Sequence, residues 1–404
     1  MAMKQTQTKL FAFSDVGIDI STGSRALFPD RFKRMFVQGY NVQTVSNVTV
    51  SGNQVTLTYG GSHGYVADRV LKIDSGNLAA INNGEFHIDS VTTNTVTMTI
   101  DDAPLSIAGG FATRVAPLGW ELVYEVANHI HLYKLKHKDN SDLYLRLVFQ
   151  TLTNARHGIA VCVGKTANEA TGVITDPFAY TANAARADAN SDLVWDFRSN
   201  INNDSHANWT YSQGASTYGD GYVIGSLYHV GFTYNMSVGS NRGNFCGVFP
   251  VSVLSYDQLD YPLVIGGYFG SPHTTNVLSP TYLTNQRGFI GQVEVIDGSS
   301  NTNFLWYAAA AENSLSSFLD SIGTLAAQPL PLYEKSTRQF LGVAKGIYKL
   351  NLKASVNLVG TGTADMPRIL EEADYSNKIL HAYVANSVSA GTQAHVIMPM
   401  EPVL

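Results

Sequence analysis

The sequence predicts a mainly β protein, and three observations lead to this expectation. Short runs of alternating apolar and polar residues recur along most of the 404 residues, with Gly and Asn turns between them. Glycine is abundant, with 35 residues, whereas charged residues make up only 14% of the chain. One stretch has clear helical spacing. We therefore expect a small β-barrel or meander domain near the N-terminus, a larger antiparallel β-sandwich, a small C-terminal β module and one helix near 304–322.

Residues 1–38 precede the first regular strands. The segment contains Phe11 and Phe13, and then a basic, aromatic stretch with Phe32 and Phe36. Two interpretations are open: an N-terminal arm that contacts a neighbouring subunit, or the first edge strand of the next domain. The first interpretation makes these four phenylalanines candidate assembly contacts.

Residues 39–104 are expected to form the small β-domain. The run Val55-Thr-Leu57-Thr-Tyr59 alternates strictly, and a second alternating run extends from Val91 to Ile100. Gly52-Asn53 and Asn83-Gly84 are turn pairs between such runs. Period-two alternation over short strands predicts a meander or small barrel. The segment contains no cluster of reactive side chains.

Residues 105–330 are expected to form the β-sandwich. A glycine-rich linker at 108–120 leads into successive apolar strands, and Lys138-Asp-Asn-Ser141 supplies a hairpin turn. Residues 165–220 are rich in Ala, Asn, Asp and Ser, which indicates long surface loops around one strand near 194–197. Many short strands with glycine-rich turns are typical of an antiparallel sandwich.

The last part of this region carries the expected helix, in which Leu315, Phe318, Leu319 and Ile322 recur at helical spacing. Pro329 ends that pattern. The strand texture then returns, and we assign residues 331–404 to a small C-terminal β module.

Composition excludes several functional classes. The net charge of −6 and the pI near 6.0 argue against a nucleic-acid partner, which would need a basic face. We find no signal peptide and no apolar run long enough to span a membrane. Cys162 and Cys246 each lie in an apolar strand-like run, so buried free thiols are favoured over a single bridge.

Several motifs resemble chemical sites, and each fits a loop or a packed surface better. Gly360-Thr-Gly362 lacks the third glycine of a nucleotide loop. The pattern Asp188-Ala-Asn190-Ser-Asp192 starts like a calcium loop but lacks its Gly and Glu. His129 and His131, with His137 or His157, would be a zinc set if all faced one site. We therefore expect no cofactor, and whether a loop binds a metal ion stays open.

The sequence contains no catalytic motif. There is no Gly-x-Ser-x-Gly elbow, and Asp257, Asp260 and Glu294 are acids without a recognisable pairing. Trp195, Trp209 and Tyr211 are candidates for stacking on a glycan or contacting a partner. Core or subunit-interface packing is the stronger interpretation of these aromatic residues.

The chain resembles virion structural proteins of tailed bacteriophages, and its small β-domain is similar to one inserted in many tail and baseplate proteins. The sequence departs from the usual pattern of these proteins at 165–220 and 297–330. The resemblance implies no known active site. It is carried by these segments: Val55–Tyr59, Ser62–Tyr65, Arg69–Ile73, Asn83–Phe86, Gly119-Trp120, Leu143–Leu147, Asn154–Arg156 and Arg338–Gly346.

The resemblance and the low charge lead to one functional expectation. We expect a non-enzymatic structural subunit of a phage tail or baseplate, assembled in the host cytoplasm into the virion as a homo-oligomer with other tail subunits. The alternatives are a receptor- or glycan-binding tail-tip protein that contacts a host surface glycan, and a polysaccharide depolymerase. The depolymerase lacks support because no β-helix repeat is present.

Overall fold

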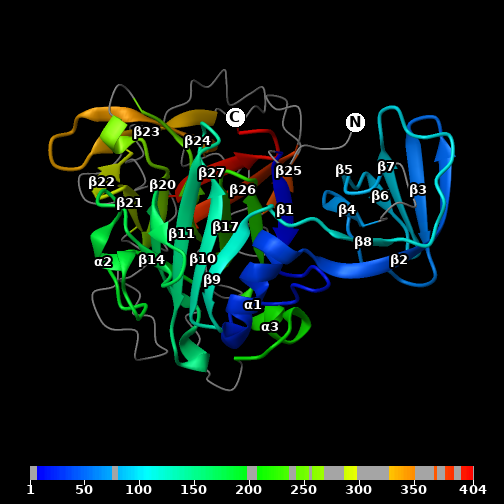
Figure 1. Cartoon of the computed structure of the whole chain (residues 1–404), viewed down its shortest axis with the longest axis horizontal. Coiled ribbons are helices and arrows are strands. Elements are labelled where there is room, and N and C mark those ends of the chain that lie inside the picture. The colour runs from blue at the N-terminus through cyan, green and yellow to red at the C-terminus, as the bar shows by residue number, and fades with distance from the viewer. Residues whose placement is uncertain are drawn as a thin grey trace.

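The computed structural model confirms a mainly β protein, in which every strand pairing among the described residues is antiparallel (Figure 1). The predicted helix near 304–322 lies outside the described residues. No helix in the part of the chain that the structure describes is long and apolar enough to cross a membrane. The structure describes residues 7–74, 81–197, 207–235, 243–253, 257–267, 286–297, 327–350, 368–370, 378–385 and 393–403.

The small β-domain is a seven-stranded sheet that projects from one side of the molecule (Figure 1). Its end strands β5 and β6 do not pair with each other, so the sheet is not a closed barrel. In spatial order the strands are β5 (Glu85–His87), β4 (Val70–Asp74), β8 (Ala112–Val115), β2 (Tyr40–Ser51), β3 (Gln54–Tyr59), β7 (Thr95–Thr99) and β6 (Ser90–Val91).

The expected domain boundary at Pro104 is too early. Strand β8 pairs with both β2 and β4, so the domain sheet continues to Val115. The glycine-rich stretch at 108–120 was expected to be a linker, but it contains this strand. Although β8 has only four residues, it forms a stable strand because it makes hydrogen bonds to a neighbouring strand on each of its two edges.

Strand β2 is bent and serves two parts of this sheet. Its first residues pair with β8 and its later residues pair with β3, with a register irregularity between Val45 and Asn47. A bulge of this kind bends a strand and increases its twist. The inner faces then meet in one core, in which Val55, Leu57 and Phe86 are buried.

The N-terminal residues belong to the body of the protein. Strand β1 (Lys9–Ala12) pairs with β16 (Gly221–Gly225), a strand of the body rather than of the domain that follows it along the chain. It is followed by the short helices η1 (Arg25–Leu27), α1 (Phe28–Lys33) and η2 (Arg34–Gln38).

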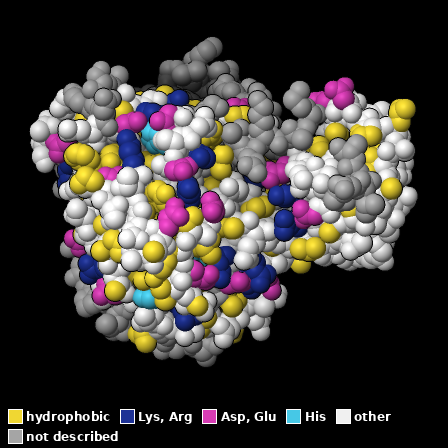
Figure 2. All heavy atoms as spheres, viewed as in Figure 1, with side chains coloured by type: hydrophobic (Ala, Val, Ile, Leu, Met, Phe, Trp, Pro, Cys, Tyr) yellow, Lys and Arg dark blue, Asp and Glu magenta, His cyan; other side chains and the backbone are white. Residues whose placement is uncertain are grey.

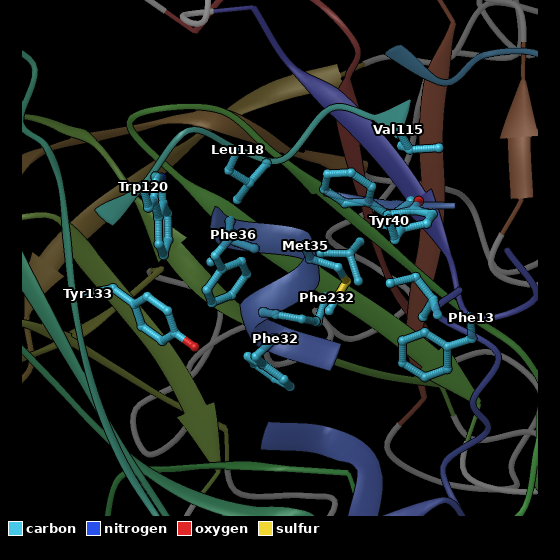
Figure 3. Packing of buried hydrophobic residues seen from close by; sticks show 14 of the residues in the cluster. Phe13, Phe32, Met35, Phe36, Tyr40, Val115, Leu118, Trp120, Tyr133 and Phe232 are labelled. Atoms are coloured by element: carbon cyan, nitrogen blue, oxygen red, sulfur yellow. The ribbon is translucent and has the colours of Figure 1, made fainter. Parts of the chain in front are cut away.

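The four phenylalanines expected as assembly contacts are core residues of their own chain. Phe11, Phe13, Phe32 and Phe36 are at most 1% exposed. Figure 3 shows Phe36 beside Trp120 and Tyr133, and its ring centroid lies 4.6 Å from that of Trp120 and 5.2 Å from that of Tyr133. Because their surface is buried inside the protomer, these side chains are not contacts for a neighbouring subunit.

One layer of the body is an antiparallel meander. The predicted hairpin between its second and third strands is confirmed, and Asn140 adopts a positive φ of 66° in the turn. The strands are β9 (Glu121–Val126), β10 (Ile130–Lys136), β11 (Asp142–Phe149), β12 (Gly158–Gly164) and β15 (Val194–Asp196).

The central layer is buried on both faces. Along it, alternate residues belong to two different cores: Phe232 and Val248 face the meander, whereas Ile224 and Phe249 belong to the second core. Its strands are β1, β16, β17 (Val230–Asn235), β18 (Gly243–Phe249), β20 (Leu263–Gly267), β21 (Gln286–Ile290) and β22 (Val293–Ile296).

The C-terminal strands form a third layer, hydrogen-bonded to the body. Strand β22 pairs with β23, and β19 pairs with β24, so hydrogen bonding runs continuously from the body into residues 331–404. The second apolar face of the central layer requires this cover. The strands are β19 (Val251–Val253), β23 (Ala327–Glu334), β24 (Phe340–Leu350), β25 (Arg368–Leu370), β26 (Ile379–Ala385) and β27 (Gln393–Pro399).

The two cysteines are free and buried, which confirms the prediction of buried free thiols, and burial raises the pKa of the Cys162 thiol to about 12.

The region expected to be mostly surface loops also contains short regular elements. The remaining elements are η4 (Thr153–Ala155), β13 (Ala167–Asn168), β14 (Val173–Ile174), α2 (Thr181–Ala184), α3 (Tyr211–Tyr218) and η6 (Asp257–Leu259).

Candidate functional site

The three aromatic residues proposed as a glycan platform do not form one. Trp195 is fully buried, and its Nε1 donates a hydrogen bond to the Ile265 carbonyl at 3.0 Å. Trp209 and Tyr211 are half-buried near the start of α3. A sugar ring needs an exposed face to stack on, and Trp195 offers none.

The histidines proposed as a zinc set each have a separate role. His129 lies in the turn before β10, where its Nδ1 is 2.8 Å from the Phe149 carbonyl oxygen. His131 is buried with its Nδ1 2.8 Å from the Tyr133 hydroxyl, and burial lowers its pKa to about 4. His137 lies near Asp260, at 3.7 Å. Among the residues that the structure describes, no group of His, Cys, Asp and Glu is arranged to hold a metal ion.

The calcium-like segment is a turn held by its own side chains. The Asp188 Oδ1 accepts hydrogen bonds from Arg186 Nε at 2.8 Å and from the Asn190 amide at 3.0 Å. The Asn190 Oδ1 accepts one from Gln150 Nε2 at 3.1 Å. These oxygens already have donors, so the pattern is that of a solvated Asx turn.

Two other acids are engaged by cations. Glu294 accepts hydrogen bonds from Arg287 at 2.7 and 2.8 Å and from Lys335 at 2.8 Å, and Asp260 pairs with Lys138. The side chain of Asp257 and the loop 360–365 lie outside the described residues.

The most developed polar cluster lies at the junction between the small β-domain and the body. There the Asp15 Oδ2 accepts hydrogen bonds from Arg69 Nε at 2.8 Å, the Tyr40 hydroxyl at 2.7 Å and the Ala12 amide at 3.0 Å. Its Oδ1 accepts from Arg69 Nη2 at 2.9 Å. Asp15 and Arg69 are each only 5% exposed, so this is a bidentate ion pair inside the protein.

Electrostatics favour the charged form of Arg69. Burial alone would lower the pKa of Arg69, but the Asp15 carboxylate outweighs that effect and raises the pKa above its usual range. Burial and the same carboxylate raise the pKa of Tyr40. Both oxygens of the Asp15 carboxylate accept hydrogen bonds, three at Oδ2 and one at Oδ1, so this group holds β1, β2 and the strand that follows Arg69 in a fixed arrangement.

Two more ion pairs join the same two parts. Lys9 of β1 is fully buried, and its Nζ lies 2.6 Å from the Glu85 Oε2 of β5. Burial lowers the pKa of Lys9 although Glu85 opposes the change. At the margin, Lys378 contacts both oxygens of Asp68 at 2.9 and 2.8 Å. The three pairs link β1, the loop after β1 and the start of β26 to the small β-domain.

A titratable carboxyl lies beside this junction. The Asp220 Oδ1 accepts a hydrogen bond from the Gly221 amide at 2.7 Å, and the Tyr211 side chain is also bonded to this carboxyl. Burial raises the pKa of Asp220 to about 6, and the negative charge of Asp15 adds to the rise. Tyr211 therefore contacts an acid of its own chain.

The open face of the small β-domain is built mainly of hydroxyl and amide side chains, and at its edge the Asp89 carboxylate accepts a hydrogen bond from Thr99 at 2.8 Å. In-register positions on neighbouring strands, such as Thr49, Thr56, Thr97 and Ser90, point to the same side. The Thr56 and Thr97 hydroxyl oxygens are 3.2 Å apart. This threonine face consists of Asn47, Thr49 and Ser51 of β2, Gln54, Thr56 and Thr58 of β3, Thr95, Thr97 and Thr99 of β7, and Ser90 of β6.

The surface view agrees with this description. In Figure 2 the outer part of the small β-domain is mostly white and yellow, apart from acidic side chains at its top. Blue and magenta side chains gather where this domain meets the body (Figure 2). The junction is thus charged and the projecting part is largely neutral.

Sequence reasoning did not find the junction. Asp15 and Arg69 are 54 residues apart and belong to no motif, so no local pattern could pair them. The alternation Val55-Thr-Leu57-Thr predicted a strand, but not the row of threonines that continues across four strands.

Comparison with known proteins adds little. No protein-family model matches this chain, and no curated protein sequence matches it. A solved structure of a phage phi92 endosialidase aligns over 88% of this chain and 51% of its own, with 8% identity and a TM-score of 0.16. The chain thus spans about half the length of that enzyme. A TM-score this low carries no argument about fold or function.

Proposed function

We propose that this protein is a structural subunit of a bacteriophage tail or baseplate, which works by assembly with other virion subunits rather than by catalysis. The sequence resemblance described above is one support. The low charged fraction of 14% is a second, because interface surfaces are depleted in charged residues. In this proposal the protein is made in the host cytoplasm and ends in the virion.

One observation carries the proposal: a small β-domain with a largely neutral open face is fastened to the body by buried ion pairs. Arg69 with Asp15 and Lys9 with Glu85 cross the junction with almost no solvent exposure. Buried charges are tolerated only in well-defined geometry, so they favour one orientation of the domain. A fixed, largely neutral projection suits a subunit that must repeat the same contact in a particle.

The test is to delete the coding region from the phage that encodes the chain and to examine the particles by electron microscopy. We expect particles that lack a complete tail, with rescue when the chain is supplied in trans. Complete tails that fail to adsorb to cells would instead support the receptor- or glycan-binding alternative. Complete tails that adsorb but cannot degrade surface polysaccharide would support the depolymerase, and either result would overturn the assembly proposal.

A further inference from the structure

The start of helix α3 (Tyr211–Tyr218) is held by two carboxyl groups of its own chain. The Asp19 Oδ1 accepts a hydrogen bond from the Tyr211 amide at 3.0 Å. The phenol of Tyr211 is hydrogen-bonded to the Asp220 carboxyl, whose Oδ1 also accepts one from the Gly221 amide at 2.7 Å. The first residue of α3 is thus bound at its backbone by the loop after β1 and at its side chain by the residue before β16.

The rest of α3 packs on the segment that precedes α1. Tyr218 is fully buried, and a Cβ at Gly23 would lie 2.3 Å from its ring, so the ring rests directly on the glycine backbone. Gly214 lies as closely against Ser21, and the Thr22 hydroxyl donates a hydrogen bond to the Tyr218 carbonyl at 3.2 Å. Because α3 belongs to no sheet, it can leave the body by a local opening that breaks no strand pairing.

Asp220 is an acid without a cation of its own. The charged and titratable groups that act on it come from four elements: Tyr211 of α3, Tyr222 of β16, Asp15 of the loop after β1, and Arg69 of the small β-domain. The Arg69 Nε and Nη2 are already bonded to Asp15, and within the described ranges no ion pair joins Asp220 to a cation. Two carboxyl groups therefore face one guanidinium, and the group that is left without it favours the neutral form.

A proton on Asp220 therefore favours the docked helix. In the docked state an ionised Asp220 is removed from water and lies near the negative charge of Asp15, and both effects cost free energy. When α3 moves away, Tyr211 leaves this carboxyl and water reaches it, so the cost disappears. The docked state has its full advantage below the ordinary pKa of 3.8 and loses it as the pH rises to the raised pKa of about 6.

We propose that α3 is a pH-controlled flap, which stays docked while Asp220 is protonated and is released more often when Asp220 is ionised. This inference goes beyond the proposed assembly function and does not rest on it. The two pKa values of the carboxyl set the size of the effect, and the equilibrium constant for release should rise by up to about fiftyfold between pH 4 and pH 8.

Hydrogen exchange of the full-length protein, followed by mass spectrometry, measures this release. The Gly214 and Gly219 amides donate to the Thr210 and Ala215 carbonyls, and so short a helix is not stable once it leaves the body. After correction for the intrinsic effect of pH on exchange, protection of these amides should fall by about fiftyfold from pH 4 to pH 8. In Asp220→Asn it should stay constant, because the amide does not ionise. A fall that persists in this variant would overturn the proposal.

Low concentrations of urea separate release of the helix from unfolding of the whole chain. Local release exposes little surface, so exchange at α3 should be nearly independent of urea, whereas exchange at the amides of β10 should increase with it. The same urea dependence at α3 and β10 would mean that the helix opens only when the body unfolds. That result would contradict the flap.

Two further variants complete the test. Asp188→Asn neutralises an acid on an exposed turn and should leave the pH response of α3 unchanged. Equal effects of Asp188→Asn and Asp220→Asn would mean that net charge governs release, against the proposal. Tyr211→Phe keeps the ring but removes the hydroxyl, which favours the ionised carboxyl, so the fall in protection should move to higher pH. A response that does not move would contradict the contact on which the flap depends.

Discussion

The central layer of the body and the sheet of the small β-domain are both antiparallel, but they use their two faces differently. In β17 (Val230–Asn235) every residue is buried: the alternate residues Val230, Phe232 and Tyr234 belong to the first core, and the opposite face is also covered by the chain. In β3 (Gln54–Tyr59) only the alternate residues Val55, Leu57 and Tyr59 are buried. The same backbone geometry therefore gives a sealed layer in one region and an open face in the other.

The difference shows where the protein holds its stability and where it leaves surface for contacts. The body gains from apolar burial on both sides of one sheet. The small β-domain keeps one face for solvent or a partner and is fastened to the body by ion pairs. The predictions below separate these contributions.

The largest effect is expected in the body core. Phe32→Ala should lower the free energy of unfolding by about 3–5 kcal/mol, because it removes a fully buried ring. The ring centroid lies 5.1 Å from that of Phe232 and 5.3 Å from that of Phe36. Urea denaturation measures the change. Leu152→Ala, at a side chain that is 54% exposed, should change it by less than about 0.5 kcal/mol.

The junction should respond according to burial. Arg69→Met leaves the Asp15 carboxylate buried without its cation, and we expect a loss of about 3–5 kcal/mol. Lys378→Met removes a pair in which the lysine is 37% exposed, so it should cost about 1 kcal/mol at most. Calorimetry should also resolve two unfolding transitions in Arg69→Met, where the wild type has one. Equal effects of the two substitutions would contradict the claim that the buried pair Asp15–Arg69 holds the small β-domain to the body more strongly than the exposed pair does.

A pH-dependent effect is expected beside the junction. The pKa of Asp220 rises from an ordinary 3.8 to about 6 on folding, so the folded protein binds the proton more tightly. Ionisation of Asp220 therefore lowers the free energy of unfolding. This loss is absent below pH 3.8, grows as the pH rises, and is complete above pH 6. Asp220→Asn removes this cost and should stabilise the protein by about 3 kcal/mol at pH 8.

The control for Asp220→Asn is the same comparison near pH 4. There the wild type and the variant should differ little, because Asp220 is already protonated in the folded state. Burial lowers the pKa of His131 to about 4 and that of His229 to about 3, which acts in the opposite direction. These histidines are present in both proteins, so the difference between the two stability curves isolates Asp220.

The smallest effects compare two threonines. Thr233 on β17 is 1% exposed, and its hydroxyl has no hydrogen-bond partner within the described ranges. Thr233→Val removes this unsatisfied group and should stabilise the protein by about 1 kcal/mol. Thr97→Val on the threonine face should change the stability of the single chain by less than about 0.5 kcal/mol. Thermal unfolding at low protein concentration distinguishes the two.

Local sequence patterns predicted individual strands better than they predicted how the strands and helices pack together. The alternation around Val55 and Leu57 predicted the strands of the small domain. The same approach missed the helix at Phe28, Phe32 and Phe36, whose four-residue spacing is helical, because the intervening charges suggested an exposed arm. Those charges lie on the opposite side of the helix.

What the sequence could not predict depends on contacts between distant residues. The third layer could not be predicted from strands such as β17, because Val230, Phe232 and Tyr234 alternate with small or polar residues as they would on a strand with one open face, although every residue is buried. The pairs Asp15–Arg69 and Lys9–Glu85 join separate parts of the chain. Their partners become neighbours only after both sheets have formed, so no spacing rule identifies them.

The most direct test of the central claim is quantitative mass spectrometry of purified particles of the phage that, under this proposal, encodes the chain. A structural subunit should be present at a fixed copy number per particle, in a whole-number ratio to the other tail proteins, and should remain through density-gradient purification. Absence from purified particles, or a copy number that varies between preparations, would contradict the proposed role in assembly.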